Sequence, residues 1–564
     1  MTHSPKERDG DRNPGSEIGQ NRPFSSAFEG RSVLYTRRMP AFESAPEALP
    51  DRTAGAAPPD AAAPSGSAPI RRGDTLEIEV LDLAFGGRAL ARIDGFVVFV
   101  ENALPGDRVT ATVYRKHRRY AEARALRVLR PAATRVEPRC EHVPVCGGCR
   151  TQDLAYEEQI RHKERQVEAA LEHLGGLRVP LRPTIPAPRL FHYRNKMEYS
   201  FAQDASGRLA LGLHVRGFFD RTFDLMRCHI ATPVSSRIVA FVRDAARREG
   251  LTAYDTRRHE GLLRYLAIRE GIRTGEVMVN FVATEPHPFF ERIAPAIVRA
   301  FPRVRSVLLN LTRRRAQVAT GEEERILAGS PTILETLGGL TFEISSSSFF
   351  QTNTEQAERL LEVAIEGLGL TGAERVLDVY SGTGTFTLPI AKHAREAIGI
   401  ESSDVAVRDA ERNAKRNGIA NARFWTGEAM EILRDRFGLG TPQGGGRGTS
   451  RAPAPGGSMR PGTGVLRADA GGGALHDIDA VLVDPPRAGL HPGVVSRLIH
   501  LGAPRLVYVS CNPSTLGRDL ALLCERRYRP LWVRAVDMFP HTSHIECVAV
   551  LERTPSASPQ ESIP

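Results

Sequence analysis

Two short apolar runs near the C-terminal end constrain the fold of this chain more than any other feature. They cover residues 481–483 and 506–509, and each stops abruptly at a polar cluster, Asp484-Pro-Pro-Arg487 after the first and Ser510-Cys-Asn-Pro513 after the second. Aliphatic runs that end in turn formers are typical of buried parallel strands. Ligands of an open α/β sheet bind just beyond the carboxyl ends of such strands. We therefore expect a carboxylate and a thiol to lie side by side at the functional edge of an α/β sheet.

The stretch before these runs predicts a nucleoside-bearing cofactor at the same edge. Residues 376–385 form an expected strand that runs into a turn containing Gly382 and Gly384, and the next strand ends at Glu401. Glycine lets a ligand approach the backbone, and an acid at the second strand end can accept hydrogen bonds from ribose hydroxyls. Thr387 stands where the pyrophosphate fingerprint would have its third glycine. The pattern therefore favours S-adenosylmethionine over NAD.

The N-terminal part of the chain divides into an extension and a small barrel. Residues 1–70 are rich in Pro, Ala, Gly, Ser and charge, and we expect them to be disordered because they can bury little apolar surface. Residues 71–131 carry five short expected strands between turns, which is typical of an OB-like β-barrel. The basic stretch Arg115-Lys-His-Arg-Arg119, followed by Tyr120, could hold phosphates and stack a base. A solvated hairpin tip is the plainer interpretation, but the barrel context favours nucleic acid.

Three cysteines within ten residues predict a metal site. Cys140, Cys146 and Cys149 lie in a glycine-containing loop, and Cys228 is the next cysteine along the chain. His142 competes with Cys228 as the fourth ligand. Four thiolates suit an iron–sulfur cluster and mixed cysteine–histidine sets suit zinc, so the spacing alone leaves both open. The spacing differs from that of radical enzymes, so no redox role is implied.

The rest of the chain divides into a mixed domain and an α/β domain. Residues 132–340 are expected to be α+β, and Arg194, Lys196 and the run Arg313–Arg315 could line an RNA groove, although each alone is more simply a solvated charge. From residue 341 to 553 strands and helices alternate. Within that domain the Gly/Pro-rich residues 438–474 are an expected flexible insertion, and residues 554–564 are an expected tail.

Composition limits the partners and the compartment of such a chain. The 564 residues carry a formal net charge of +10, with a pI near 9.4, which fits a polyanionic partner. No apolar run approaches the roughly 20 residues that span a bilayer, and the N-terminus has no signal-peptide core. We expect a cytoplasmic protein without a membrane partner, whose seven cysteines are reduced, metal-bound or catalytic.

Five motifs together resemble those of the RNA (uracil-5-)-methyltransferases. They are Phe349-Phe-Gln-Thr-Asn353, Asp378-Val-Tyr-Ser-Gly-Thr-Gly-Thr385, Asp484-Pro-Pro-Arg-Ala-Gly489, Ser510-Cys-Asn-Pro513 and His544-Ile-Glu546. The chain is similar to the subgroup with a TRAM barrel and a four-iron cluster, typified by 23S ribosomal RNA enzymes. The resemblance implies a class I (Rossmann-like) S-adenosylmethionine methyltransferase domain at 341–553, a TRAM barrel at 71–131 and a central domain with a [4Fe–4S] cluster. The implied cluster ligands are Cys140, Cys146, Cys149 and Cys228.

The resemblance also implies covalent catalysis, which the chemistry of the residues supports independently. C5 of uracil is a poor nucleophile, and addition of the Cys511 thiolate to C6 would activate it. Glu546 would then remove the C5 proton, and Asp484 would orient the base. The implied cofactor pocket consists of Gln351, Tyr380, Gly382, Gly384, Thr385, Glu401, Glu428 and Asp484. The target base must leave its stack to enter such a site.

Several alternatives stay open at this point. We expect a monomer that acts on RNA and not on DNA. The resemblance favours 23S rRNA as the substrate, and tRNA is the alternative. Cytosine C5 methylation also uses a thiolate, whereas adenine N6 enzymes need none and usually have an aromatic residue where Arg487 stands. A non-catalytic RNA-binding or ribosome-assembly factor would not need Cys511. The presence of both the glycine turn and Cys511 argues against that last alternative.

Overall fold

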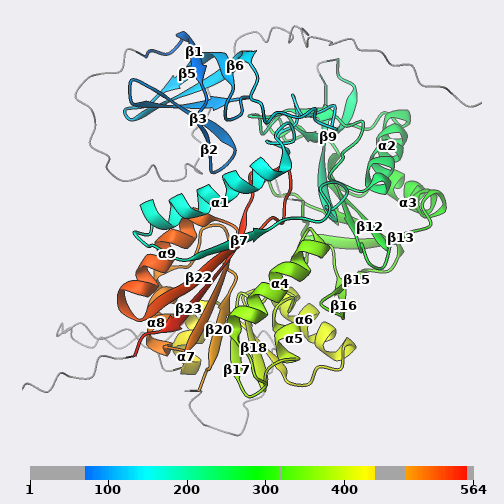
Figure 1. The fold of residues 1–564 in the computed structure, drawn as a ribbon. Coiled ribbons are helices and arrows are strands. Elements are labelled where there is room, and N and C mark those ends of the chain that lie inside the picture. Colours follow the sequence, from blue (N-terminus) through cyan, green and yellow to red (C-terminus); the bar gives the residue numbers. More distant parts are fainter. Residues whose placement is uncertain (1–69, 205, 317–318, 438–476, 556–564) are drawn as a thin grey trace, which may run out of the picture. The chain divides into compact units, whose positions relative to one another are not determined.

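The computed structural model describes residues 70–204, 206–316, 319–437 and 477–555. The expected N-terminal extension (1–70), insertion (438–474) and tail (554–564) fall almost wholly outside these ranges. Within them the chain builds a six-stranded sheet, a seven-stranded sheet, an eight-stranded sheet and a two-stranded hairpin (Figure 1).

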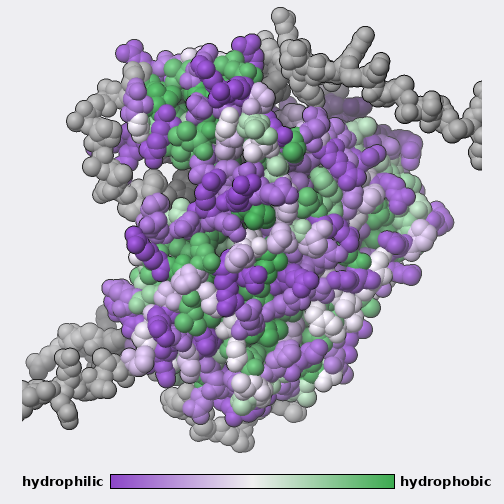
Figure 2. Space-filling model, viewed as in Figure 1, coloured by the Kyte–Doolittle hydropathy of each residue, from purple (hydrophilic) through white to green (hydrophobic). Residues whose placement is uncertain are grey.

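The six-stranded sheet follows the expected barrel region, in the order β1-β5-β6-β4-β3-β2. Its strands are β1 (Thr75–Glu79), β2 (Asp82–Ala84), β3 (Arg88–Ile93), β4 (Phe96–Glu101), β5 (Arg108–Lys116) and β6 (Tyr120–Arg130). Val109, Ala111 and Val113 of β5 are fully buried, because alternate residues of a strand face the core. Hydrophobic side chains are exposed among charged ones on this part of the molecule (Figure 2). The structure adds β2 to the five expected strands, since three residues are too few to give a periodic signal.

The seven-stranded sheet forms the central domain with two helices on one face. Its order is β10-β9-β8-β11-β12-β13-β14. The elements are β8 (Lys196–Gln203), β9 (Leu209–His214), β10 (Thr222–Asp224), α2 (Pro233–Arg248), β11 (Leu263–Glu270), β12 (Val277–Ala283), α3 (Pro288–Ala300), β13 (Val304–Leu311) and β14 (Glu323–Gly329). Tyr199, Ile238, Phe281 and Phe290 are fully buried in the core that joins the sheet to α2 and α3.

The eight-stranded sheet carries the two apolar runs, in the order β19-β18-β17-β20-β21-β23-β22-β7. Its strands are β7 (Leu181–Ile185), β17 (Arg375–Val379), β18 (Glu396–Glu401), β19 (Ala422–Thr426), β20 (Ala480–Val483), β21 (Arg505–Ser510), β22 (Tyr528–Val536) and β23 (Glu546–Arg553). The associated helices are α1 (Tyr156–His173), α4 (Thr354–Leu368), α5 (Thr387–Ala391), α6 (Asp404–Arg416), α7 (Ala429–Phe437), α8 (Pro492–Leu501) and α9 (Pro513–Arg526). Most strands are parallel, and β23 pairs antiparallel with both β21 and β22.

Helices cover both faces of this sheet. In β20, Leu482 packs into the core that includes α4, whereas Val481 and Val483 pack into the opposite core, which includes α9. Alternate residues of one strand thus enter two different cores, which explains why the run is apolar throughout. The expected Rossmann-like α/β architecture is confirmed by this arrangement.

Two elements of this layer come from the region before residue 190. β7 pairs in parallel with β22 as the edge strand, and α1 packs beside α9 (Figure 1). A side chain at Gly517 of α9 would place its Cβ 2.5 Å from the Ala170 carbonyl oxygen, so glycine permits the close helix contact. The predicted central domain, 132–340, included both elements, whereas their packing puts them with the α/β sheet. Pro183 within the five residues of β7 weakens the strand signal.

Helix caps and a tight hairpin position the polar motifs. Asn353 and Asn512 are the N-caps of α4 and α9, and each side chain accepts a backbone N–H of the first turn. Pro513 follows at the first helical position, which its fixed φ suits. The hairpin β15 (Ile333–Leu337) and β16 (Leu340–Ile344) turns at two glycines of positive φ, as two-residue hairpins require.

No helix in the ranges that the structure describes is both long and apolar enough to cross a membrane.

Candidate active site

Three strand ends place Asp484, Cys511 and Glu546 at one edge of the sheet. β20 and β21 are parallel neighbours, so Asp484 and Cys511 leave the sheet on the same side. β23 runs antiparallel to β21, and Ser510 pairs with Cys547. Cys511 directly follows the last residue of β21 and Glu546 is the first residue of β23, so continuing this register by one step would set the two residues opposite each other. Directly opposed residues of such strands have Cβ atoms about 4.5–5.5 Å apart.

The groups around Cys511 favour the neutral thiol. Burial, followed by the carboxyl groups of Glu546 and Asp484, raises the pKa of Cys511 to about 11. Burial and the neighbouring Asp484 raise the pKa of Glu546 well above its usual value. Burial, with a contribution from Asp378, raises the pKa of Asp484 to about 7. The Arg487 guanidinium lowers the pKa of both Cys511 and Glu546, so it favours the charged forms that catalysis would need.

Arg487 contacts the segments that carry the two groups whose pKa values it lowers, one after β21 and one before β23. Its backbone carbonyl accepts a hydrogen bond from the Asn512 side-chain amide at 3.1 Å. Its guanidinium Nη2 lies 3.5 Å from Nδ1 of His544, two residues before Glu546. Sequence reasoning used Arg487 only to separate enzyme classes and missed it as a site residue, for which its place after the two prolines was the available signal.

The loop of residues 539–545, which precedes Glu546, is fixed by groups far away in the sequence. The backbone N–H of His541 donates to Oε1 of Gln159 in α1 at 2.9 Å. The Tyr193 hydroxyl donates to the carbonyl of Pro540 at 2.9 Å. His541 has a φ of +67°, which is uncommon for a residue other than glycine, so these contacts hold the backbone in an otherwise unfavoured shape.

A left-handed turn follows β17 at the expected cofactor edge. Tyr380, Gly382 and Gly384 have φ values of +74°, +55° and +82°. A Cβ at Gly384 would lie 3.1 Å from Leu388 and 3.2 Å from Phe424, so a side chain there would crowd the core. Glycine therefore allows both the turn and the close backbone approach that a nucleoside needs.

Glu401, at the end of β18, forms a hydrogen bond with this turn. Its Oε2 accepts the backbone N–H of Gly382 at 3.0 Å, and its Oε1 accepts that of Ser403 at 2.8 Å. The carboxylate is thereby oriented at the strand end, where further lone pairs can accept ribose hydroxyls.

The remaining predicted cofactor residues border the same turn or the segment before α4. Burial and Glu428 raise the pKa of Tyr380 to about 12. Thr385 is buried, and so is Gln351, whose backbone carbonyl accepts a hydrogen bond from the Asn195 side chain at 3.0 Å. The structure thus places these residues on elements that meet at the carboxyl edge of the sheet.

Asp378 is a buried acid that sequence reasoning quoted in a motif without assigning it a role. Its Oδ2 accepts a hydrogen bond from the Thr387 hydroxyl at 2.5 Å, while Oδ1 is buried without a partner. Burial raises the pKa of Asp378 to about 7. An acid inside an otherwise apolar strand was the signal that could have found it.

The loop that holds the first three cysteines is fastened by one arginine. Nη2 of Arg216 donates to the carbonyls of Val143 and Cys149 at 2.9 and 2.8 Å, and its Nε donates to that of Cys146 at 3.3 Å. Cys146 also forms an isolated antiparallel β-bridge with Val215. The loop is therefore anchored to the segment after β9.

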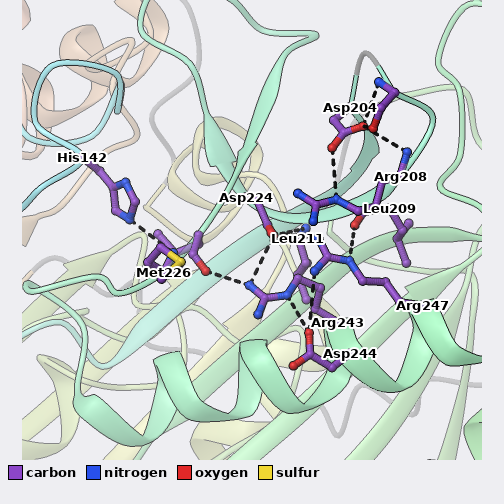
Figure 3. Close-up of polar contacts among 12 residues, drawn as sticks. His142, Asp204, Arg208, Leu209, Leu211, Asp224, Met226, Arg243, Asp244 and Arg247 are labelled. Carbon is purple, nitrogen blue, oxygen red and sulfur yellow. Dashed lines mark hydrogen bonds and ion pairs between the residues drawn. The ribbon is translucent and has the colours of Figure 1, made fainter.

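A second network fixes the segment that carries Cys228 (Figure 3). Asp224 accepts hydrogen bonds from Arg243 at 3.3 Å and Arg247 at 2.8 Å, both from α2. The Met226 backbone N–H donates to Nε2 of His142 at 3.2 Å, which joins this segment to the cysteine loop. This contact occupies the lone pair with which His142 Nε2 would bind a metal.

The four cysteines predicted to bind metal are electrostatic neighbours. Burial, followed by the thiols of Cys228, Cys146 and Cys140, raises the pKa of Cys149. Burial raises the pKa of Cys228 to about 11, and the thiols of Cys146 and Cys140 add to the effect. Among the described residues, however, no group of three or more His, Cys, Asp or Glu side chains forms a ready-made chelate. The donor set of four thiols, with Nε2 of His142 already engaged, fits iron–sulfur ligation in its chemistry.

Comparisons with known proteins identify the family and the domains of this chain. The tRNA (uracil-5-)-methyltransferase family matches residues 474–554, the TRAM domain residues 69–126 and a methyltransferase domain residues 370–439. An uncharacterized RNA methyltransferase of Chlorobaculum tepidum is 38% identical over 86% of this chain and 97% of its own. Another, of Porphyromonas gingivalis, is 38% identical over 84% of this chain and 99% of its own.

A solved structure extends the comparison to three dimensions. The tRNA (uracil-54, C5)-methyltransferase of Pyrococcus abyssi, in complex with S-adenosyl-L-homocysteine, superposes with a TM-score of 0.62 at 28% identity, over 84% of this chain and 99% of that one. The fold and the strand-edge site define an S-adenosylmethionine-dependent methyltransferase. The relatives narrow the class: the chain belongs to the RNA (uracil-5-)-methyltransferase family, with a TRAM domain, and is an S-adenosylmethionine-dependent RNA methyltransferase.

Proposed function

We propose that this enzyme forms 5-methyluridine in 23S rRNA through a transient bond between Cys511 Sγ and C6 of the target uracil. The observation that carries the proposal is the opposition of Cys511 and Glu546 across β21 and β23, with Asp484 at the same edge. A nucleophile and a base on facing strands can act on C6 and C5 of one flat ring. The enzyme works in the cytoplasm, where thiols stay reduced.

The proposed reaction passes through a covalent bond between the enzyme and the RNA. The Cys511 thiolate adds to C6, and the ring electrons move through C5 and C4 onto O4. S-adenosylmethionine would supply an electrophilic methyl group. C5 accepts this group as the methyl–sulfur bond breaks, and S-adenosylhomocysteine leaves. Glu546 removes the remaining C5 proton, the C5–C6 double bond returns, and the C6–S bond breaks to release the thiolate.

The environment of Cys511 explains why the site needs a cation. A thiol with a pKa near 11 is almost wholly protonated at neutral pH, so only a small fraction is nucleophilic. Arg487 opposes the two carboxyl groups and stabilises the thiolate. Asp484, with a pKa near 7, can donate to or accept from the uracil edge, and it orients the base.

The choice of 23S rRNA rests on the similarity to enzymes that combine a TRAM domain with the cysteine set. The name of the solved Pyrococcus relative specifies uracil-54 of tRNA, which makes tRNA the second candidate substrate. Incubating the purified protein with each RNA and digesting it to nucleosides for mass spectrometry tests the proposal. We expect 5-methyluridine from 23S rRNA; 5-methylcytidine, N6-methyladenosine or methylation of tRNA alone would contradict it.

We also propose that Cys140, Cys146, Cys149 and Cys228 hold a [4Fe–4S] cluster. The support is that the thiols of Cys228, Cys146 and Cys140 contribute to the raised pKa of Cys149, and that hydrogen bonds anchor both segments. The cluster would cross-link these two segments and help to shape the RNA-binding surface. It would have no redox part in methyl transfer. Cys146→Ser should lose iron and methylation together, and a folded, iron-free variant with normal activity would refute this role.

A further inference from the structure

Three cations meet on the face of the central sheet that is turned away from α2 and α3. Lys196 of β8 and Arg269 of β11 are direct partners in the antiparallel register, so their side chains share one face. The side chain of Arg194 joins them, and its Nε donates to the Lys196 carbonyl at 3.0 Å. Like charges directly opposed across strands are destabilising unless something compensates them.

The protein compensates this charge only in part. Lys196 pairs with Glu198 at 2.9 Å, and its side chain is 30% exposed. Arg269 is 5% exposed; its Nη2 donates to the Ser348 carbonyl at 2.6 Å, while Nη1 is buried without a partner. Asp409, whose charge also acts on Arg269, already accepts hydrogen bonds from Ser348 and Arg412. A buried unpaired donor of this kind is costly, and an oxyanion would satisfy it.

The cluster lies between the segment before α4 and the loop of residues 539–545. Asn195, within the cluster, donates from its backbone to the Thr352 carbonyl at 2.9 Å and from its side chain to the Gln351 carbonyl at 3.0 Å. The Arg194 guanidinium lies 5.9 Å from the ring centre of Phe539, in the loop before Glu546. In the same segment as Gln351, Phe349 is 62% exposed. A ligand at the cluster would therefore adjoin both the segment that carries Gln351 and the loop that precedes Glu546.

We propose that Arg194, Lys196 and Arg269 form a binding site for an RNA phosphate, that of a nucleotide adjoining the target uridine. Lys196 and Arg194 reach the phosphate from the solvent side, and Arg269 supplies positive charge beneath them. Contacts to the sugar–phosphate backbone of the RNA fix the position of an RNA strand whose target base is extruded. This inference rests on the proposed function, since the ligand is the RNA of that reaction.

The test measures affinity for a 23S rRNA fragment that the wild-type enzyme methylates, at several salt concentrations. Loss of one phosphate contact lowers the slope of log affinity against log salt by about 0.7 for single-stranded RNA. Lys196→Met should show that change and bind about fivefold more weakly at 0.1 M salt, if the affinities converge near 1 M. Lys196→Arg should restore the slope, and Lys415→Met on α6 should match the wild type.

The affinity for S-adenosylhomocysteine distinguishes the other source of an oxyanion. The carboxylate of the cofactor has similar chemistry, so weaker S-adenosylhomocysteine binding by Lys196→Met with an unchanged RNA slope would overturn the proposal. An unchanged slope in both Lys196→Met and a folded Arg269→Met would also overturn it. A wild type that forms no 5-methyluridine contradicts the proposed function instead, so the two failures are separable.

Discussion

Cys511 and Glu546 occupy opposing positions at the ends of the antiparallel strands β21 and β23, one step beyond the Ser510–Cys547 pair. The register of a sheet is rigid, because a one-residue slip would move every side chain of β23 to the other face. Cys511 follows the last residue of β21 and Glu546 is the first residue of β23, so the strand register limits the geometry between the proposed nucleophile and the proposed base.

Replacing the base should separate adduct formation from product release. In Glu546→Gln the thiolate can still add and C5 can still be methylated, but the C5 proton stays. We expect turnover to fall by roughly 10²–10⁴-fold and a covalent protein–RNA species to accumulate on denaturing gels. Glu525→Gln, an exposed residue of α9, is the matched control and should behave as wild type. A Glu546→Gln enzyme that turns over normally would remove the base from its proposed role.

The pH dependence should report the thiol. Because Cys511 reacts as the thiolate and its pKa is raised to about 11, the single-turnover rate should increase by about tenfold per pH unit between pH 7 and 9. Arg487 lowers this pKa, so Arg487→Gln should shift the profile to higher pH, while Arg487→Lys should shift it less. An identical profile in all three proteins would show that Arg487 does not act on the thiol.

A buried ion pair should stabilise the chain just before the loop of residues 539–545. Lys163 of α1 pairs with Asp537 at 2.6 Å, and both residues are buried. Lys163→Met leaves an unpaired buried carboxylate, so we expect a loss of about 3–5 kcal/mol in the free energy of unfolding. Urea titration measures this loss. Arg359→Met, which breaks an exposed pair with Glu362, should cost less than about 1 kcal/mol, and equal effects would contradict the assignment.

The arginine that fastens the cysteine loop should control metal content. Arg216→Met removes the donors to three carbonyls, those of Val143, Cys146 and Cys149. We expect anaerobically purified protein to fall from about four irons per chain to well below that number. Arg221→Met, which removes a neighbouring arginine stacked on Phe218, is the control. Full iron in Arg216→Met would show that the loop does not need this anchor.

Local sequence patterns predicted the elements that carry the site. The runs before Asp484 and Cys511 are apolar throughout because both faces of the sheet are covered, and that property is visible without a structure. The glycine turn after β17 was equally visible, since its positive φ values call for glycine at two of three positions.

Long-range pairings could not be predicted in the same way. The position of β7 beside β22, the Lys163–Asp537 pair and the register that opposes Lys196 to Arg269 each join residues more than 70 positions apart. No local period reports such contacts, because they depend on how whole elements pack. The sequence marks the positions of Arg487 and Asp378, but it does not show which groups they act on: Arg487 lowers the pKa of Cys511, and Asp378 raises that of Asp484.

The most direct test of the covalent mechanism uses RNA that contains 5-fluorouracil. Fluorine at C5 cannot leave as a proton, so the reaction should stop at the adduct once S-adenosylmethionine has supplied its methyl group. We expect a band shifted by the mass of the RNA on a denaturing gel for the wild type and for Cys524→Ala, and no such band for Cys511→Ala. A wild type that binds this RNA and yet forms no adduct, or an adduct that persists in Cys511→Ala, would contradict it.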